Sequence, residues 1–331
     1  MSAFVCPWCF KEQKAKGFFF KAPEKCVCGK ETHKSFREAP NLRITVVGAK
    51  GSGKTHFFTL LIRRIREIVA AQGGYLHGLN DHTLAYGNDK YKQLAEGDER
   101  GVRATIESTN KGTIEPLHYD LTLGKKSVAL AFADTAGEAL VNEKEVGRIG
   151  DYMLNASAII CIIDPLQLPS VRRALIASGI PEEDLPDVEA ETGTILNRIC
   201  LILRKRLRSG ERSKIPLAIA FSKIDALQQG DEIAKGVHGM LAEESRHCGG
   251  FNEAQFTAIN NTMCSWLQDV DNTADILNQS NAFERVGFFG FSALGQNPGR
   301  RQELTRALRP IRVEDPFLWL LNRNGFVRTI R

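Results

Sequence analysis

One octapeptide, Gly48-Ala49-Lys50-Gly51-Ser52-Gly53-Lys54-Thr55, has the residue types and the spacing that suit phosphate binding. Its glycines let backbone N–H groups wrap around phosphate oxygens, and a following helix adds a favourable dipole. The Lys54 ammonium can reach the β- and γ-phosphates of a nucleotide, and the Thr55 hydroxyl can bind Mg²⁺. A simple glycine-rich turn would give the Lys-Thr pair no role. We therefore predict a nucleotide-binding loop formed by Gly48, Lys50, Gly51, Ser52, Gly53, Lys54 and Thr55.

The residues on either side of this loop have the patterns of a strand and a helix. Residues 42–47, LRITVV, form a short apolar run rich in β-branched side chains. The residues after the loop place apolar side chains on one helical face as far as Gly73-Gly74. Strand, loop and helix is the context in which the phosphate motif is meaningful.

A second apolar run, residues 127–133, leads into Asp134-Thr135-Ala136-Gly137. At the end of a strand, Asp134 can hold Mg²⁺ through water, and the Gly137 N–H can meet the γ-phosphate. Residues 117–123 and 127–133 are expected to form a hairpin around Gly124-Lys125-Lys126. A third run, residues 158–164, ends at Asp164 before a proline, and we interpret Asp164 as a turn residue.

Two further apolar runs end in residues that could recognise a base. Residues 216–221 lead into Ser222-Lys223-Ile224-Asp225, and residues 286–291 lead into Ser292-Ala293-Leu294. The Asp225 carboxylate can accept hydrogen bonds from N1–H and from the 2-amino group of guanine, an arrangement that adenine does not offer. The alkyl stem of Lys223 can lie over the purine, and the second loop can present a backbone N–H to guanine O6. We therefore predict that the bound nucleotide is GTP or GDP.

The ordered motifs GAKGSGKT, DTAGE, SKID and SAL resemble the signature of Ras-like GTPases within the translation-factor-related class of P-loop proteins. The long stretches around residues 165–215 and 226–285, which we expect to be helical inserts, and the closing DPFLWLL are more similar to bacterial GTPases of the double-GTPase type. Those proteins are associated with conflict and immune systems. The resemblance covers about residues 41–331 and implies an α/β P-loop NTPase fold. It implies a six-stranded, mostly parallel sheet, helices on both faces, and nucleotide at the carboxyl edge.

The sequence departs from the Ras-like pattern at two positions. Ser222 stands where asparagine or threonine is usual, and its shorter reach weakens contact with the base or the phosphate loop. Glu138 stands directly after Gly137, where glutamine is usual. Ionised glutamate can only accept hydrogen bonds, and it sets a negative charge near the γ-phosphate, so we expect slow hydrolysis. The alternative is that Glu138 points away into a surface salt bridge.

The resemblance also implies a threonine that closes over Mg²⁺ and the γ-phosphate. In the expected hairpin Asp134 lies opposite about Pro116, so a threonine a few residues earlier would approach the metal. We favour Thr113 for this role, with Thr105 as the alternative. The predicted catalytic residues are thus Lys54, Glu138 and Thr113, and the predicted Mg²⁺ ligands are Thr55, Thr113 and Asp134.

The first forty residues contain two close cysteine pairs, Cys6 with Cys9 and Cys26 with Cys28. Two such pairs can converge on one tetrahedral Zn²⁺, and a segment with so little core needs a staple of this kind. The second pair is one residue tighter than the usual spacing, so His33 is a spare ligand. The alternative is a disordered lysine-rich tail with free thiols. We expect residues 1–40 to be a zinc-ribbon-like segment and residues 41–331 to be the GTPase domain.

Composition limits the remaining possibilities. The chain has 331 residues and a net charge of +5, and residues 1–40 supply +4 of it, from eight Lys and Arg against four Asp and Glu. Basic charge there permits nucleic-acid contact, although such lysines more often only solubilise a small module. No apolar run reaches the ~18 residues that a membrane span needs, and the start does not read as a secretory signal. We expect a cytoplasmic protein.

Three functions are compatible with these motifs. The first is a regulatory GTPase with slow Mg²⁺-dependent hydrolysis and a protein effector or activating partner. The second is a nucleotide-gated binding module with negligible hydrolysis, which holds a partner through its zinc segment. The third, a P-loop ATPase or kinase, is disfavoured by Asp225 and by the loop at Ser292.

Overall fold

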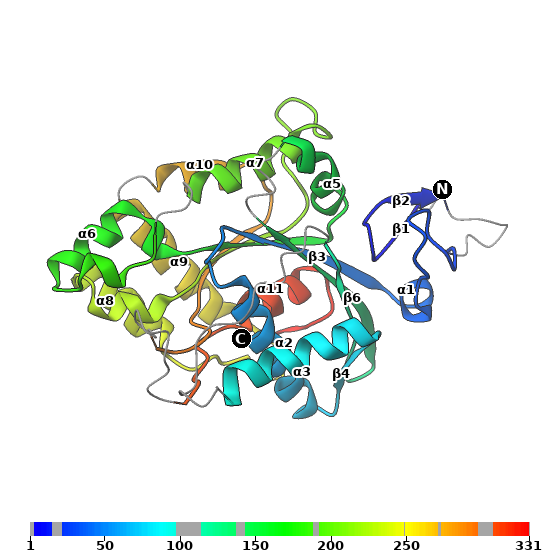
Figure 1. The fold of residues 1–331 in the computed structure, drawn as a ribbon, viewed down its shortest axis with the longest axis horizontal. Helices are drawn as coiled ribbons and strands as arrows, with labels where there is room; N and C mark the ends of the chain where they lie inside the picture. The colour runs from blue at the N-terminus through cyan, green and yellow to red at the C-terminus, as the bar shows by residue number, and fades with distance from the viewer. Residues whose placement is uncertain are drawn as a thin grey trace.

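The structure is a computed structural model that describes residues 3–14, 22–96, 114–136, 143–187, 192–247, 249–270, 273–296 and 307–330. Its centre is a seven-stranded sheet in the order β10-β8-β7-β3-β6-β5-β4 (Figure 1). The strands are β3 (Asn41–Gly48), β4 (Tyr75–Gly78), β5 (Leu117–Leu123), β6 (Lys126–Ala136), β7 (Ala158–Ile163), β8 (Leu217–Phe221) and β10 (Val286–Gly290). Neighbours from β10 to β6 are parallel, whereas β6, β5 and β4 pair antiparallel.

The sheet confirms the predicted α/β class with one strand more than expected. Strand β4 is the addition, and it pairs with the edge of β5, where Tyr75 lies opposite Thr122. Its four residues alternate between exposed and buried, so only Leu76 and Gly78 face the core. A strand this short has too little apolar pattern to be separated from a loop in the sequence.

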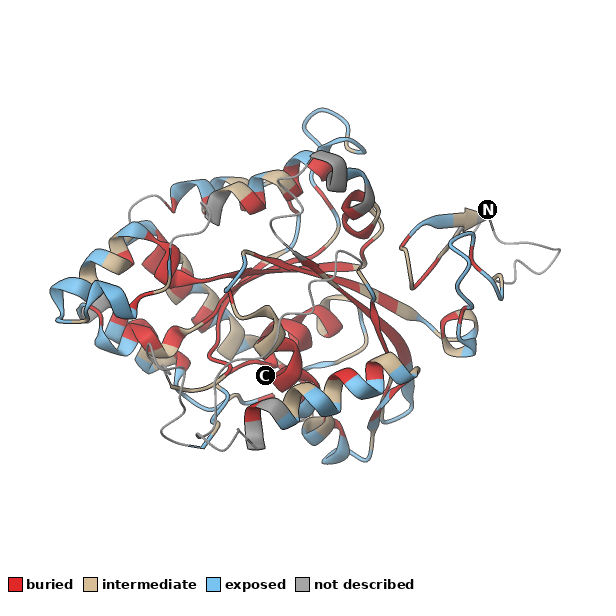
Figure 2. Ribbon diagram, in the orientation of Figure 1, coloured by how far each residue is buried: buried red, intermediate tan, exposed pale blue. Residues whose placement is uncertain are grey.

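The central strands are buried on both faces, as parallel strands between helical layers must be. In β7, Ala158, Ile160 and Ile162 point into one core, whereas Ile159, Cys161 and Ile163 point into the other. This alternation follows from the two-residue repeat of a strand. Figure 2 shows buried residues following the central strands.

Helices cover both faces of the sheet. The first core is completed by α2 (Lys54–Ala70), α3 (Asp81–Glu96) and α11 (Asp315–Arg323). The second is completed by α5 (Glu143–Leu154), α6 (Pro169–Ala177), α7 (Thr192–Arg204), α8 (Glu232–Leu241), α9 (Glu253–Asp269) and α10 (Ala274–Ser280). None of the described helices combines the length and the apolar composition that crossing a bilayer requires.

The two long stretches between sheet strands are built mainly of helices. Between β7 and β8 lie the short helices η1 (Pro165–Gln167) and η2 (Glu182–Asp184) together with α6 and α7. Between β8 and β10 lie η3 (Ile224–Gln229), α8, the short strand β9 (Phe251–Asn252), α9 and α10. Strand β9 pairs with β11 (Thr329–Ile330), which brings the end of the described chain back to the second insert.

The N-terminal module, residues 3–14 and 22–40, lies at one side of the sheet (Figure 1). It consists of an antiparallel pair, β1 (Ala3–Val5) and β2 (Glu12–Lys14), followed by a turn region and α1 (Lys34–Glu38). His33 caps α1, because its Nδ1 accepts a hydrogen bond from the Ser35 N–H at 3.2 Å. Strand β3 begins directly after this module.

Candidate nucleotide and metal sites

The loop between β3 and α2 needs its glycines for steric reasons. Gly51 and Gly53 have left-handed φ angles of 71° and 87°, which side chains other than glycine rarely adopt. A Cβ on Gly48 would come within 2.7 Å of the Ile162 carbonyl oxygen in the neighbouring strand. A Cβ on Gly51 would meet no atom within 4 Å, so the tip of the loop is open. These features form a cradle at the N-terminus of α2.

Lys54, the first residue of α2, reaches back over this cradle. Its ammonium donates hydrogen bonds to the carbonyl oxygens of Gly48 at 2.8 Å and of Ala49 at 2.9 Å. The charge therefore lies inside the loop, where nucleotide phosphates would bind. Ser52 is buried in the same loop, and its N–H donates to the Ala49 carbonyl.

Asp134 lies on β6, in register with Val46 of β3, two residues before the cradle begins. The next residue locks the two strands together, because the Thr135 hydroxyl donates to the Val46 carbonyl at 3.0 Å. Burial raises the pKa of the Asp134 carboxyl, and the charge of Lys54 offsets part of that rise. Its Oδ1 is buried without a hydrogen-bond partner among the described residues. A buried carboxylate oxygen left unpaired in this way is costly unless a cation binds it.

The two predicted base-recognition loops follow adjacent parallel strands, β8 and β10. Backbone hydrogen bonds join them, from Phe291 N–H to the Phe221 carbonyl at 2.8 Å and from Ile224 N–H to the Phe291 carbonyl at 3.3 Å. The first loop also lies beside the cradle, since a Cβ on Gly53 would be 3.9 Å from the Ser222 Cβ. The structure therefore brings the predicted phosphate and base residues to one edge of the sheet.

Ser292 begins the second base loop, and its hydroxyl accepts the Gly295 N–H at 2.9 Å. Burial raises the pKa of Asp225, whereas the hydrogen bond from Ser292 lowers it. The Ser292 N–H is already donated to the Ile311 carbonyl. Within the part of the chain that the structure describes, no bond is recorded for the N–H groups of Ala293 and Leu294, and these are the groups that could meet guanine O6.

Lys223 and Asp164 form a contact that the sequence did not suggest. The Lys223 ammonium lies 2.5 Å from Oδ2 of Asp164, whose side chain is 2% exposed. We interpreted Asp164 only as a turn residue, and that interpretation was incomplete. Its Oδ1 does cap η1 by accepting the Leu166 N–H at 2.9 Å, but its other oxygen holds the base loop.

Four predicted site residues lie outside the described residues: Thr105, Thr113, Gly137 and Glu138. Their roles remain predictions from the sequence. We favoured Thr113 over Thr105 because Asp134 was expected to lie opposite about Pro116. In the described hairpin Leu117 pairs with Phe132, which places Asp134 opposite Glu115. This is one residue from the expected register.

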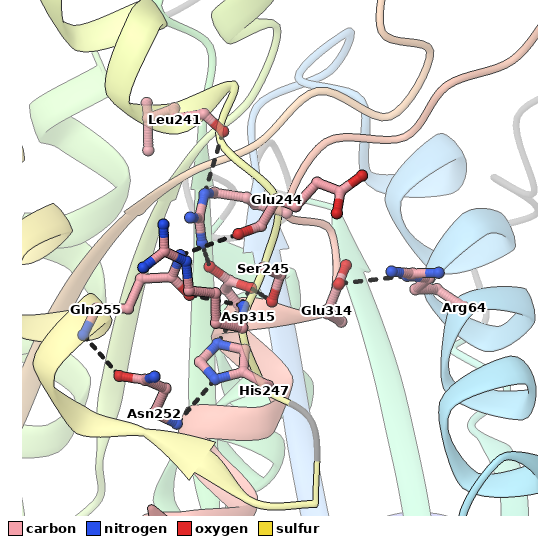
Figure 3. A network of polar contacts seen from close by, with 11 residues as sticks. Arg64, Leu241, Glu244, Ser245, His247, Asn252, Gln255, Glu314 and Asp315 are labelled. Atoms are coloured by element: carbon pink, nitrogen blue, oxygen red, sulfur yellow. Dashed lines mark hydrogen bonds and ion pairs between the residues drawn. The ribbon is translucent and has the colours of Figure 1, made fainter. Parts of the chain in front are cut away.

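A buried polar network fixes the segment that follows the second base loop (Figure 3). Asp315 accepts hydrogen bonds from Arg312 at 2.6 Å and from Ser245 at 3.1 Å, and it lies 3.3 Å from Nε2 of His247. Burial alone would raise the pKa of Asp315, but the hydrogen bond from His247 and the charge of Arg312 lower it. Glu314 is the N-cap residue of α11, and Asp315 is its first helical residue.

Glu314 ties the same segment to the helix of the phosphate loop. Its carboxylate accepts a hydrogen bond from Nε of Arg64 on α2 at 3.2 Å (Figure 3). Nearby, Ile311 exchanges two backbone hydrogen bonds with Ser292. The network thus holds the second base loop at a fixed place relative to α2.

Comparison with protein families matches residues 42–279 to Double-GTPase 2. This match covers more than half of the 331-residue chain and includes the cradle, Asp134 and the first base loop. The chain belongs to the Double-GTPase 2 family. Membership implies a P-loop GTPase that binds guanine nucleotides. Among curated proteins, none matches the chain.

The residues of this Double-GTPase 2 protein fit Mg²⁺ at the cradle. Thr55 provides a hydroxyl at the start of α2, and Asp134 provides the buried unpaired oxygen. Hydroxyl and carboxylate oxygens are the donors that Mg²⁺ accepts beside nucleotide phosphates. Thr55 and Asp134 are therefore the described residues that would hold the ion, directly or through water.

The N-terminal module of the Double-GTPase 2 protein has a donor set that suits zinc. The sulfur atoms of Cys6, Cys9, Cys26 and Cys28 all lie within 4.8 Å of one another. Those of Cys9 and Cys26 are 3.6 Å apart, close to the ~3.8 Å that tetrahedral Zn–S bonds of about 2.3 Å require. The hydrogen bond between Cys6 and Cys9 raises the pKa of the Cys6 thiol and lowers that of the Cys9 thiol to about 5, so the pair shares a proton that a bound metal would displace. His33, the spare ligand, is occupied as the cap of α1.

Backbone N–H groups point at two of these sulfurs. The Trp8 N–H donates to Cys6 Sγ at 3.4 Å, and the Cys28 N–H donates to Cys26 Sγ at 3.3 Å. Gly29 follows with a left-handed φ of 86°. The shorter second pair therefore still forms a tight turn, and N–H groups that point at sulfur stabilise thiolate charge.

The module is packed against the GTPase domain. Neutral His118, whose burial lowers its pKa to about 4, donates from Nε2 to the Pro7 carbonyl at 3.1 Å. The Tyr152 hydroxyl donates to the Trp8 carbonyl at 2.8 Å, and Phe10 is fully buried beside Tyr152. Two of the basic residues of the module pair with the domain, Lys11 with Asp151 and Lys30 with Glu115.

Proposed function

We propose that this protein is a GTP-binding regulatory switch that hydrolyses GTP slowly with Mg²⁺. The observation that carries the proposal is the position of Asp225 and Ser292, which follow two adjacent parallel strands beside the phosphate cradle. Family membership supports guanine nucleotides in general. By its resemblance to conflict-system GTPases, we further propose a role in a bacterial conflict or signalling pathway in the cytoplasm, with a protein effector or activating partner.

In this proposal each residue of the site has a separate role. The cradle N–H groups and Lys54 bind the phosphates, and Asp225, Lys223 and the second base loop select guanine. Mg²⁺, when bound, neutralises charge that develops on the phosphate oxygens. Thr55 and Asp134 would hold that ion, and Thr113 is the third ligand expected from the sequence. Glu138 lies near the attacking water, and Gly137 contacts the γ-phosphate.

A nucleotide panel tests the proposal. Calorimetry of the purified full chain with Mg²⁺ should show binding of GTP and GDP and no comparable binding of ATP or ADP. Discrimination of about 10⁴-fold is typical of a site whose buried polar groups match one base only. Tight ATP binding without GTP binding would show that the protein is a P-loop ATPase and not a GTP-binding switch.

Replacing Lys54 with alanine should raise the dissociation constants of GTP and GDP at least about 100-fold. The ammonium donates to two carbonyl oxygens of the cradle, and loss of such a preorganised donor typically costs a factor of about 10²–10³. Fluorescence titration with a ribose-labelled GDP measures the change. Lys125→Ala, in the exposed hairpin turn, is the matched control and should bind as the wild type does. Wild-type affinity in Lys54→Ala would show that phosphates bind elsewhere.

Replacing Glu138 with glutamine should accelerate single-turnover GTP hydrolysis about tenfold or more. Glutamine can donate as well as accept, and it removes a negative charge near the γ-phosphate. A hydrogen bond to a charged group is worth about 1.5–3 kcal/mol, which sets this scale. The exposed Glu183→Gln variant is the control. If Glu138→Gln and Glu138→Ala both turn over at the wild-type rate, Glu138 points away from the site.

The second candidate is a nucleotide-gated binding module with negligible hydrolysis. The packing of the N-terminal module against Tyr152 and His118 favours it, because a rigid module can present a surface to a partner. Single-turnover assays with and without cell extract separate the candidates. Hydrolysis in either condition supports the GTPase, and GTP binding with no hydrolysis in both supports the binding module.

A further inference from the structure

The backbone of Lys223 adopts a conformation that is unusual for its residue type. Its φ angle is 52°, in the left-handed region, at the turn between β8 and η3. Residues other than glycine occupy this region at a cost and persist there only when their surroundings fix them. Here the neighbouring Ile224 N–H is bonded to the Phe291 carbonyl, and the ammonium of Lys223 is held by Asp164.

Asp164 is itself immobilised. It is 3% exposed, it lies at the end of β7, and its Oδ1 accepts the Leu166 N–H. The adjacent strands are joined here, because the Ser222 N–H donates to the Ile163 carbonyl at 2.8 Å. The carboxylate therefore presents a fixed acceptor to the base loop from a neighbouring strand.

Ser222 does not provide this link. Its hydroxyl turns back to the Ile163 carbonyl at 3.3 Å, within its own pair of strands. The Asp164–Lys223 pair is the contact that ties the Lys223 side chain to the end of β7.

We infer that Asp164 is a positioning residue for guanine binding, and the inference rests on the proposed function. Its carboxylate holds the Lys223 ammonium, so that the alkyl stem of the lysine lies along the face of the purine. A fixed stem loses less side-chain entropy when nucleotide binds, and this raises affinity. Asp164 itself need not touch the nucleotide.

This role has a defined kinetic signature. The base is the same in GTP and GDP, so loss of the pair should weaken both nucleotides by the same factor. An interaction made equally in the ground state and the transition state changes affinity and leaves turnover at saturation unchanged. The preference for GTP over ATP should fall, because the contact that is lost is the one between the Lys223 stem and the guanine base in this loop.

The test is the Asp164→Asn variant of the full chain. Asparagine keeps an acceptor for the Leu166 N–H, so the cap of η1 is retained and only the charge is lost. We expect the off-rate of ribose-labelled GDP and the dissociation constants of GDP and GTP to rise about tenfold to a hundredfold, the scale of a hydrogen bond to a charged group. Single-turnover hydrolysis at saturating GTP should stay within about twofold. Asp184→Asn, exposed in the same insert, is the matched control.

Lys223→Gln cuts the same link from the other side and retains much of the stem. If Asp164 acts through Lys223, the two single variants and the double variant should weaken GDP binding by similar factors, because the second change removes nothing more. Should Asp164→Asn fail to fold in a thermal unfolding scan, Lys223→Gln still tests the link.

Several outcomes would overturn the inference. These are wild-type GDP affinity in the folded variants, additive effects in the double variant, or weakened GTP binding with unchanged GDP binding. The wild type separates this test from that of the proposed function. If the wild type binds no guanine nucleotide, the proposed function is wrong. If the wild type binds GDP and releases it at the same rate as Asp164→Asn does, only the role of Asp164 is wrong.

Discussion

The Asp225→Asn variant is expected to lose GDP affinity by at least about 100-fold and to gain affinity for xanthosine diphosphate. The carboxylate can accept two hydrogen bonds from guanine, each worth about 1.5–3 kcal/mol because one partner is charged. Asparagine offers one acceptor and one donor group. Xanthine carries a carbonyl where guanine carries the 2-amino group, so the amide matches xanthine and mismatches guanine.

Displacement of ribose-labelled GDP and XDP from both proteins measures this exchange of preference. Asp269→Asn, exposed at the end of α9, is the control and should retain the preference for GDP. Equal GDP affinity in the wild type and in Asp225→Asn would mean that the partly buried carboxylate does not face the base.

Removal of zinc should unfold the N-terminal module while the GTPase domain remains folded. Structural zinc in small modules contributes about 10 kcal/mol or more of folding free energy, and the module has little core of its own. Among the described residues its fully buried apolar side chains include Cys6 and Phe10. The paired substitution Cys6→Ser and Cys9→Ser should abolish bound zinc and expose Trp8, whose ring contacts His118 at 4.2 Å between centroids.

Elemental analysis gives the zinc content, and the red shift of tryptophan emission reports exposure of Trp8. Cys264→Ser removes a thiol outside the four-sulfur cluster and should change neither quantity. One zinc per chain that is lost only in the paired variant is the expected result. A metal-free wild type whose Trp8 is still protected would show that the four thiols do not need an ion.

The parts of the site that follow directly from local sequence could be predicted. The cradle depends on backbone angles at Gly51 and Gly53 and on the helix that starts at Lys54, and all of these are encoded within a few residues. The burial of the central strands also follows from continuous apolar runs. The buried face of α9, formed by Ile259, Met263, Trp266 and Leu267, also has the spacing that a helix requires.

The contacts between distant segments could not be predicted. Asp164 and Lys223 are 59 positions apart, and only the parallel pairing of β7 with β8 brings their ends together. A lone aspartate before proline looks like a cap, and Asp164 is a cap as well. The contacts of Asp315 with Arg312 and His247 likewise depend on the fold, because His247 is 68 positions earlier in the chain.

The packing of the N-terminal module links the metal to the rest of the chain in thermodynamic terms. The contacts of Pro7, Trp8 and Phe10 with His118 and Tyr152 exist only when the module is folded, and in our reading the module folds only with its ion. Each step therefore stabilises the other by the same free energy. The full chain should hold zinc more tightly than an excised forty-residue peptide would, by the free energy of docking. The zinc centre is thus a property of the whole chain, although all four sulfurs come from its first twenty-eight residues.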